Sequence, residues 1–422
     1  MRRIAAFAIM LSLLLGSARA AVAVRMDDAS ALLTEDGSVI VPAGTYEDIV
    51  ALGGGLFAAS SEGELYALMD AEGALLTDAV YDGFRRTDRA LLAHRDGAWG
   101  QMGPDGAEIG AFAYSRIETD GADGCWGIGE GSELIVLNAD GTARDSGLRV
   151  LRIGGAAEGL LPVELSASLW GCCDASGGLA IPAEYEYIGS FVEGRAAAVS
   201  DGLYGAIDRS GAWIVEPEYG FLEISAAGFM LAANKDGAKV LDMDGGERAL
   251  YSGANIYAAL AGVGYIVGDG ESLRIYDASG TLVQEAAPNA VVSEGMGEQL
   301  VLSEGMWGEE CVRLLGTQTA YQNLYPLGTA GGEAVYACMK VNAARYENDL
   351  LHEIQISVDM DTARYGIANA AGEQSLPYNY VSIDFLSDDR FLARTESRWQ
   401  MIDSGGRVFW SRRITQTEAP NS

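Results

Sequence analysis

The chain of 422 residues is poor in the residue types on which most catalytic and metal sites depend. It has 2 histidines and 5 cysteines, with neither a Cys-x-x-Cys pair nor a His-x-x-x-His spacing. Zinc sites and histidine-dependent hydrolases are therefore disfavoured. An odd, irregularly spaced set of cysteines also argues against the dense disulfide framework of small exported domains. We expect no metal, no cofactor and no disulfide scaffold.

Positive charge is scarce as well. Lys and Arg number 28 against 60 Asp and Glu, which gives a formal net charge of -32. Nucleic acids and anionic membrane surfaces bind to basic footprints, so both classes of partner are disfavoured. The acids are scattered along the chain, which is typical of a solvated acidic surface.

Long apolar runs are absent except at the N-terminus. Arg2 and Arg3 precede an apolar segment at residues 4–15, and small residues around Ala18-x-Ala20 follow it. This order predicts a secretory signal peptide over residues 1–20, since the segment is shorter than the about 20 apolar residues of a membrane span. The mature chain is expected to be extracytoplasmic, either secreted or in the cell envelope, without membrane insertion. An uncleaved anchor is the alternative.

What the sequence does contain is a repeated phrase: an aromatic residue, Gly, and then Asp-x-x-Gly. It returns at a spacing of about 35 residues, which indicates a repeat protein. Asp at the first turn position and Gly at the fourth predict a tight turn, and the flanking β-branched and aromatic residues predict strands. The residues of the phrase that we assign to packing and turns are Trp99, Gly100, Trp170, Gly171, Asp174, Gly177, Tyr204, Gly205, Asp208, Gly211, Tyr365, Gly366, Gly372, Trp399 and Gly406.

Each unit offers three or four short strands, because an Asp-Gly hairpin such as Asp201-Gly202 leads into the next aromatic strand. The turn glycines from Gly37 to Gly406 predict about ten complete units with partial ends. The widest gap between turns, from Gly316 to Gly372, predicts an insertion near residues 341–361 that forms a short helix or an elongated hairpin.

Residues 169–224 carry the phrase in its fullest form. They read Leu-Trp-Gly, Asp-Ala-Ser-Gly and Ile-Pro-Ala-Glu-Tyr-Glu-Tyr-Ile, and then Leu-Tyr-Gly-Ala-Ile-Asp-Arg-Ser-Gly. This stretch resembles the bacterial WG-repeat family. The resemblance implies an all-β repeat protein of mostly unassigned role, and it supplies no catalytic residues.

The expected fold is an all-β repeat array over residues 21–415, followed by a flexible tail at residues 416–422. Ten units exceed the four to eight blades of most propellers, so one large ring or two tandem rings are expected. An open β superhelical array is the alternative. For a closed ring, the segment Val22 to Met26 is expected to supply a missing strand to the last unit, which ends in Val408-Phe409-Trp410.

Two acids and two tyrosines form a tentative ligand rim. Glu184 and Glu218 hold one repeat position, and Tyr185 and Tyr219 hold the next. Paired carboxylates are what glycoside hydrolases need, and aromatic rings beside acids suit sugar binding. Acids that recur at a turn in every unit are, however, usually solvated loop residues.

The two histidines and one acidic loop are weaker candidates for further sites. His94 lies just before the Asp96-Gly97 turn and is expected to be a hairpin shoulder, while His352 lies in the insertion. The segment from Asp242 to Glu247 lacks the later ligands of a full calcium loop and is read as a hairpin.

The sequence therefore predicts a non-catalytic exported module for binding or scaffolding. We expect a monomer whose protein or glycan ligand contacts the repeat-rim loops and the insertion. A carboxylate-dependent enzyme acting on polysaccharide or peptidoglycan is one alternative, and a passive cell-envelope spacer is another.

Overall fold

The computed structural model describes residues 21–26, 29–87, 90–120, 124–260, 264–295, 299–305, 309–348 and 353–414. The predicted signal peptide at residues 1–20, the predicted tail at 416–422 and His352 lie outside the described residues. The described part is entirely β: it forms eleven antiparallel sheets in chain order and contains no helix. The prediction of an all-β repeat protein is confirmed.

The first five sheets contain the following strands. They are β1 (Ala21–Arg25), β2 (Ser30–Thr34) and β3 (Val39–Tyr46); β4 (Asp48–Gly53), β5 (Leu56–Ser60) and β6 (Ala67–Met69); β7 (Gly83–Arg86), β8 (Leu91–Arg95), β9 (Ala98–Met102) and β10 (Glu108–Tyr114); β11 (Arg116–Thr119), β12 (Cys125–Ile128), β13 (Glu133–Leu137) and β14 (Ala143–Arg149); and β15 (Arg152–Ile153), β16 (Leu160–Ser166), β17 (Leu169–Asp174) and β18 (Leu179–Tyr185).

The remaining six sheets follow in the same manner. They are β19 (Tyr187–Ile188), β20 (Arg195–Ser200), β21 (Leu203–Asp208) and β22 (Trp213–Tyr219); β23 (Phe221–Ser225), β24 (Phe229–Asn234), β25 (Gly237–Leu241) and β26 (Glu247–Ser252); β27 (Asn255–Leu260), β28 (Gly264–Gly268), β29 (Leu273–Asp277) and β30 (Leu282–Ala286); β31 (Val291–Glu294), β32 (Leu300–Ser303) and β33 (Val312–Leu314); β34 (Asn323–Ala330), β35 (Glu333–Asn348), β36 (Glu353–Asn369) and β37 (Gln374–Tyr380); and β38 (Ser382–Ser387), β39 (Arg390–Arg394), β40 (Arg398–Ile402) and β41 (Val408–Arg413).

The Asp-x-x-Gly turn joins the last two strands of a sheet. In the sheet that begins with β19, one carboxylate oxygen of Asp208 accepts hydrogen bonds from the backbone N–H groups of Ser210 (2.8 Å) and Ala212 (3.0 Å). Gly211 closes the turn at a φ of 88°, a left-handed conformation that favours glycine. The repeated Asp and Gly are therefore the turn chemistry of each sheet.

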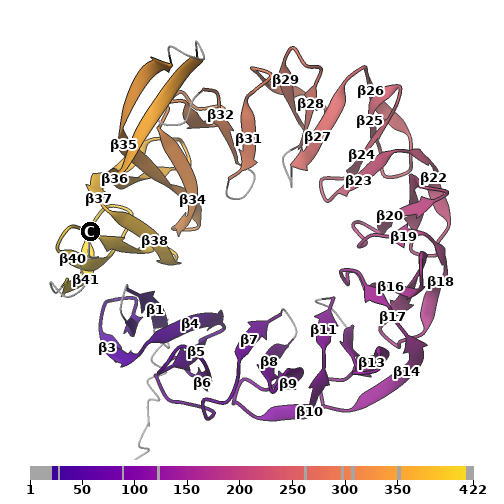
Figure 1. Ribbon diagram of the computed structural model, residues 1–422, viewed down its shortest axis with the longest axis horizontal. Coiled ribbons are helices and arrows are strands. Elements are labelled where there is room, and N and C mark those ends of the chain that lie inside the picture. The colour runs from indigo at the N-terminus through magenta and orange to yellow at the C-terminus, as the bar shows by residue number, and fades with distance from the viewer. Residues whose placement is uncertain are drawn as a thin grey trace, which may run out of the picture.

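The sheets stand side by side around a ring, with the first strand of each sheet innermost and the last at the outer rim (Figure 1). Apolar side chains fill the space between neighbouring sheets. Cys172 and Cys173 show this arrangement, because adjacent strand residues point to opposite faces. Cys172 packs with Ile188 and Ile207 of the next sheet, while Cys173 packs with Trp126 of the preceding one. The fold is a propeller made of one large ring.

Eleven sheets correspond to the eleven turn glycines, so the expectation of about ten units was one too low. Weak motifs did not mean missing sheets: the units at Gly245 and Gly280 both form four strands. The second sheet has three named strands, and the bridge between Tyr66 and Tyr81 continues its outer edge. A hairpin needs only a compatible turn and a buried face, which other residue types can also supply.

The ring closes through the packing of its first and last sheets. Val24 and Leu33 share a buried cluster with Trp399 and Met401, and Arg390 Nε donates to the carbonyl oxygen of Glu35 (2.9 Å). The predicted strand exchange is wrong. β1 pairs with β2, and the last sheet is already complete because β41 pairs with β40. Buried apolar contact between two finished sheets therefore takes the place of shared strand pairing.

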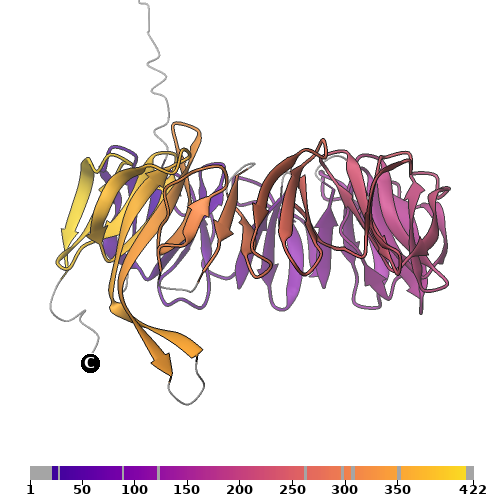
Figure 2. The same cartoon turned by 90° about the horizontal axis from the view of Figure 1, so that it is seen from above.

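The insertion is an elongated hairpin rather than a helix. β35 and β36 pair from Val335↔Asn369 to Asn348↔Glu353, whereas their neighbours β34 and β37 cover only the base of the pair. The rest projects from one face of the ring as a two-stranded ribbon (Figure 2). Val341 and Ala363 anchor its base in a small buried cluster with Met339.

Candidate binding surface at the channel mouth

The aromatic residue of the repeated phrase belongs to the core. Trp170 and Trp399 are each 5% exposed, and Trp99, Tyr204 and Tyr365 are half-buried. The glycine that follows allows the next strand to approach closely. A methyl group on Gly171 would lie 2.5 Å from the carbonyl oxygen of Ile181. These residues are a packing code and do not form a site.

The tyrosines of the tentative rim are not available to a ligand. Tyr185 is 4% exposed and Tyr219 is 3% exposed, because both rings fill the space between adjacent sheets. The Tyr185 hydroxyl donates to the carbonyl oxygen of Gly211, and burial raises the pKa of this phenol. Glu184 and Glu218 are exposed, but they lie on the outermost strands β18 and β22. The expected rim is thereby corrected for its tyrosines, whose rings belong to the core, while its two acids are exposed.

The structure brings a different set of residues together, two positions after a buried residue that is a tyrosine in three units and Val150 in the fourth. This position begins the innermost strand of the following sheet. Tyr187 and Phe221 hold it in β19 and β23, and Arg116 and Arg152 hold it in β11 and β15. All four side chains are exposed. Four successive sheets therefore present two arginines and two aromatic rings at one mouth of the central channel.

The sequence contains a signal for only part of this set. Tyr187 and Phe221 each lie two residues beyond the tyrosine of a proline-containing element, so their position can be located in those two units. Arg116 and Arg152 follow no such element. The variability of this position hid it, because a search for recurrent residues selects those that serve packing. Only the placement of the sheets around one ring shows that Arg116, Arg152, Tyr187 and Phe221 are neighbours.

Grooves lie between the inner edges of these sheets. One of about 410 Å³ is lined by Arg116, Leu151 and Arg152. Another of about 350 Å³ is lined by Tyr187, Phe221 and Glu223 among others. Phe221 also borders a third groove of about 530 Å³ together with Glu218 and Lys235. The channel mouth thus offers shallow depressions at two places, between the sheets of β11 and β15 and between those of β19 and β23.

Arg152 is held firmly although its side chain is 67% exposed. Its Nε and Nη2 atoms both donate to the carboxylate of Glu164, with 3.0 Å for the Nη2 bond. These hydrogen bonds, and one from the backbone N–H of Ser168, lower the pKa of Glu164. The guanidinium also lies over the Trp170 ring, 5.4 Å from its centroid. A buried carboxylate therefore fixes an exposed guanidinium.

Trp170 links this arginine to the neighbouring sheet. Its ring meets the Tyr187 ring edge to face, with centroids 5.6 Å apart. Between the two sheets the Ser190 hydroxyl donates to the carbonyl oxygen of Gly155 (3.0 Å). Arg152, Trp170 and Tyr187 consequently form one continuous series of contacts from the fifth sheet to the sixth.

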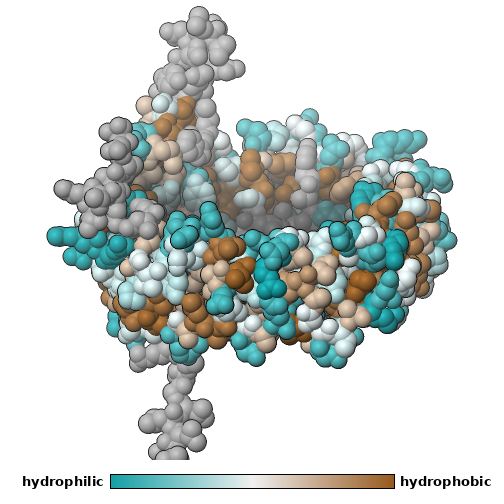
Figure 3. All heavy atoms as spheres, turned by 60° about the horizontal axis from the view of Figure 1, so that its bottom comes forward, coloured by the Kyte–Doolittle hydropathy of each residue, from teal (hydrophilic) through white to brown (hydrophobic). Residues whose placement is uncertain are grey.

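The projecting ribbon rises from the same face of the ring that carries Arg152 and Tyr187. Tyr187 pairs with Val199 and Phe221 pairs with Ala233, in each case two residues before the two-residue turn that joins the second strand to the third. The equivalent residue of the hairpin sheet, Asn323, pairs with Met339, after which β35 continues instead of turning. Figure 3 shows this face, with the ring hollowed at its centre and apolar residues on the visible wall.

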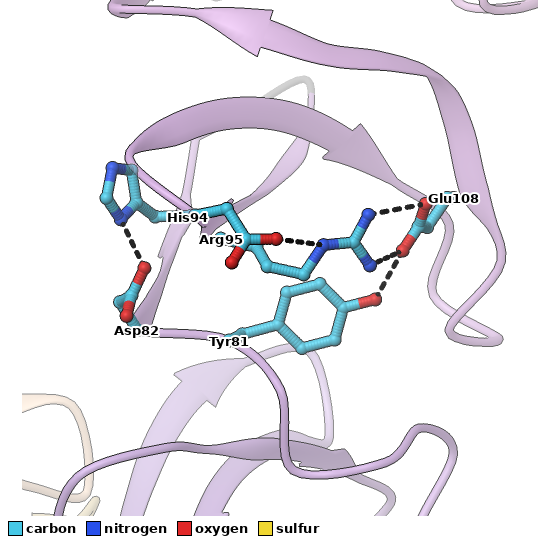
Figure 4. A network of polar contacts seen from close by, with 6 residues as sticks. Tyr81, Asp82, His94, Arg95 and Glu108 are labelled. Carbon is cyan, nitrogen blue, oxygen red and sulfur yellow. Dashed lines mark hydrogen bonds and ion pairs between the residues drawn. The ribbon is translucent and has the colours of Figure 1, made fainter.

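A separate polar network ties the second sheet to the third (Figure 4). Arg95 binds Glu108, and the Tyr81 hydroxyl donates to the same carboxylate (2.9 Å). Burial alone would raise the pKa of Glu108, but the hydrogen bonds from Arg95 and Tyr81 lower it. Burial and the bond to Glu108 raise the pKa of Tyr81 to about 12. These side chains bridge the two sheets.

His94 lies at the end of β8, beside the same network. Its Nδ1 atom is 3.0 Å from Asp82 Oδ2, and its ring lies 5.0 Å from that of Trp99. Asp82 and His94 also share a backbone hydrogen bond from the Asp82 N–H to the His94 carbonyl (2.8 Å). The histidine is therefore a strand-end residue whose ring is held by a carboxylate and an indole.

The described ranges offer neither a cluster of metal ligands nor a helix that could span a membrane. Within these, no group of three or more His, Cys, Asp or Glu side chains is arranged to hold a metal ion. No helix of the described part has the length and apolar character needed to cross a membrane. All five cysteines are free thiols, and four of them are buried.

Comparison with known proteins supports the repeat assignment. A family model described as "WG containing repeat" matches residues 170–204 and 204–237, which confirms the resemblance in those two units. No curated protein sequence matches the chain.

Solved structures with a similar arrangement of strands are distant. One is titled a crystal structure of the eukaryotic initiation factor (10% identity, 94% of this chain and 96% of that chain, TM-score 0.39). Another is BamB from Moraxella catarrhalis (11% identity, 67% and 88%, TM-score 0.27). A third is the C-terminal WD40 domain of Sif2 (10% identity, 59% and 86%, TM-score 0.30). At such low identities and TM-scores, these structures carry no inference about function.

Proposed function

From a β-propeller that carries two WG-containing repeats at residues 170–237, we propose a non-catalytic binding or scaffolding module that is exported from the cytoplasm. Its ligand, a protein or a glycan, binds to the face of the ring from which the hairpin projects. The mature chain acts as a monomer, because one ring with its ends packed together is complete without a second copy.

The observation that carries the proposal is the hairpin itself. Beyond Val341 neither β34 nor β37 flanks the ribbon, so the backbone N–H and C=O groups on both of its edges lack strand partners within the sheet. An isolated two-stranded ribbon is marginally stable, and open edges favour pairing with another chain. One unit out of eleven departs from the repeat in this way, which is expected where a surface serves a partner rather than the fold.

The two alternatives receive less support. A carboxylate-dependent enzyme needs acids that converge on a substrate, whereas Glu184 and Glu218 lie exposed on outermost strands. A passive spacer needs no projecting ribbon and no exposed aromatic rings at a channel mouth. Export depends on residues 1–20, which have the charge and hydropathy order of a secretory signal.

A shortened hairpin tests the proposal. Replacing residues 344–357 by Asp-Gly joins the paired residues Ala343 and Val358 through a two-residue turn and keeps the buried anchors Val341 and Ala363. Capture of envelope proteins and glycans by the mature chain is compared with capture by this variant. A Leu250→Ala variant on the outer rim serves as the control.

Loss of capture in the shortened hairpin, with normal capture by the control, supports the proposal. Equal capture by both variants would remove the hairpin from the binding surface. Fractionation of cells that express the full chain tests export, since retention of the whole chain in the cytoplasm contradicts it.

A further inference from the structure

The residues at the channel mouth indicate a class of ligand, and this inference rests on the proposed function. It concerns the surface formed by Arg116, Arg152, Tyr187 and Phe221, which we call the mouth strip. These residues begin the inner strands of four successive sheets, on the face that carries the hairpin.

Charge limits what can bind there. The formal net charge of -32 opposes a polyanion at long range. Within a Debye length, about 8 Å at physiological salt, only the local charges matter. At the mouth strip each arginine already forms an ion pair: Arg116 Nε lies 2.7 Å from Glu118 Oε1, and Arg152 binds Glu164. The strip is therefore locally balanced, which favours neither a polyanion nor a polycation.

The hydrogen-bonding groups of the strip are fixed in place. Glu164 occupies Nε and Nη2 of Arg152, which leaves Nη1 directed away from that carboxylate as a pre-positioned donor. Glu223, half-buried beside Tyr187 and Phe221, supplies an acceptor in the adjoining groove. Donors and acceptors of this kind suit hydroxyl groups, which both donate and accept.

The aromatic rings supply the complementary apolar contact. Tyr187 is 42% exposed and Phe221 is 40% exposed, and Trp170 supports the Tyr187 ring from behind. A pyranose ring has an apolar C–H face and a hydroxyl-bearing edge, so stacking on an aromatic ring and hydrogen bonding at its rim satisfy it together. An acidic peptide would use the rings but would meet the unfavourable net negative charge of the chain.

Two grooves on one face of the ring favour a chain of sugars over a single unit. The groove at Arg116 and Arg152, about 410 Å³, leads across the Trp170 edge to the groove of about 350 Å³ at Tyr187. The first groove lies between the fourth and fifth sheets and the second between the sixth and seventh, so a ligand that occupies both must extend past the Trp170 edge. A linear ligand with repeating units matches such a surface.

We propose that the mouth strip binds a neutral polysaccharide, with sugar rings stacked on Tyr187 and Phe221 and hydroxyl groups bonded to Arg152 and Glu223. Binding is reversible recognition, and no bond of the glycan is broken.

Calorimetric titration of the mature chain tests this proposal. The probes are neutral hexasaccharides of β-1,4-glucose, α-1,4-glucose, β-1,4-mannose and β-1,4-N-acetylglucosamine, together with tetragalacturonate and a glutamate-rich peptide. The variants are Tyr187→Ala and Phe221→Ala, whose exposed side chains can be removed without opening the core. Tyr325→Ala is the matched control, because this tyrosine is also 42% exposed and lies on the inner strand β34 across the ring (Figure 1).

At least one neutral hexasaccharide is expected to bind, and each strip variant is expected to weaken it about tenfold or more, whereas Tyr325→Ala leaves the affinity unchanged. Three results overturn the proposal: no neutral hexasaccharide binds, the galacturonate or the acidic peptide binds more tightly, or Tyr325→Ala weakens binding as much as Tyr187→Ala. If no glycan binds while hairpin-dependent capture persists, the proposed binding function is retained and only the proposed ligand class is rejected.

Discussion

The indole of Trp170 packs edge to face against the phenol of Tyr187, with ring centroids 5.6 Å apart and planes at 66°. The two residues belong to different sheets and have different roles. Trp170 is part of the recurrent packing code and is buried, whereas Tyr187 holds a variable position and is exposed. The contact therefore shows how a uniform repeat can hold a non-uniform surface in place.

Truncation of Trp170 should lower the stability of the fold. Trp170→Ala empties a core aromatic site and is expected to lower the free energy of unfolding by about 3 to 5 kcal/mol. Chemical denaturation measures this loss. Trp170→Phe keeps most of the ring volume and should cost clearly less; equal costs for the two variants would contradict a packing role.

The glycine after the aromatic residue should not tolerate a methyl group. Gly171→Ala places a Cβ atom 2.5 Å from the carbonyl oxygen of Ile181, so the strand must shift and stability should fall by about 1 to 3 kcal/mol. Gly83 also lies in a strand, but a Cβ atom there meets nothing within 4 Å. Gly83→Ala should therefore leave the melting temperature nearly unchanged, and a comparable loss in both variants would argue against close strand approach.

Ring closure can be tested at a turn glycine. Gly37 and Gly316 both have a positive φ, of 85° and 81°, so alanine strains either backbone by about 1 kcal/mol. At Gly37 a Cβ atom would also overlap the carbonyl group of Phe409 in the last sheet, whereas Gly316 faces open space. Gly37→Ala should therefore melt at a lower temperature than Gly316→Ala. Equal melting temperatures would mean that the end sheets are not packed together in solution.

Acid should destabilise the protein through its turn aspartates. Hydrogen bonds from the Ser side chain two residues on, the largest effect, lower the pKa values of Asp174, Asp208 and Asp277. A carboxyl group with a lowered folded pKa stabilises the fold above its unfolded pKa, near 3.8, and this stabilisation is lost as the pH falls through the folded value. Unfolding should thus set in as the pH drops below about 4.

Replacing these three aspartates by Asn should weaken that pH dependence. Asn369 fills the same turn position, where its Oδ1 atom accepts from the backbone N–H groups of Ala371 (3.0 Å) and Glu373 (2.9 Å), so the turn survives the change. The triple variant should melt a few degrees lower at pH 7, because charge-assisted bonds are the stronger ones, but lose less stability on acidification. The control is a second triple variant in which Asn replaces Asp96, Asp201 and Asp236 of the Asp-Gly turns. An identical acid response in both triple variants would contradict the view that Asp174, Asp208 and Asp277 cause the acid sensitivity.

The buried thiols should be inert in the folded protein. Burial raises the pKa values of Cys172 and Cys173 to about 12. At pH 8 roughly one thiol in ten thousand is then ionised, and the core excludes the reagent as well. Iodoacetamide should label the partly exposed Cys311 first, as read by mass spectrometry, and rapid labelling of Cys172 in native protein would contradict this burial.

Short-range patterns in the sequence were sufficient to predict the strands and turns of the repeating part of the molecule. Asp208, Gly211 and Gly205 act within a few residues of themselves, so their spacing predicts turns and close strand pairing without knowledge of the whole fold. The insertion was located for the same reason, since a break in a period is visible along the chain. Its conformation was left open, because short alternating segments do not separate a helix from a ribbon.

The sequence by itself determined an all-β repeat, its turn chemistry and the place where the repeat is interrupted, because these depend on short-range hydrogen bonding and backbone geometry. The tertiary structure decided the eleven-sheet ring, its closure by packed end sheets and the burial of Tyr185 and Tyr219. It also decided that Tyr187 and Phe221, separate in the chain, share one channel mouth. Such relationships depend on how the sheets are rotated about a common axis. That rotation results from many contacts between sheets, so no single residue of the sequence predicts it.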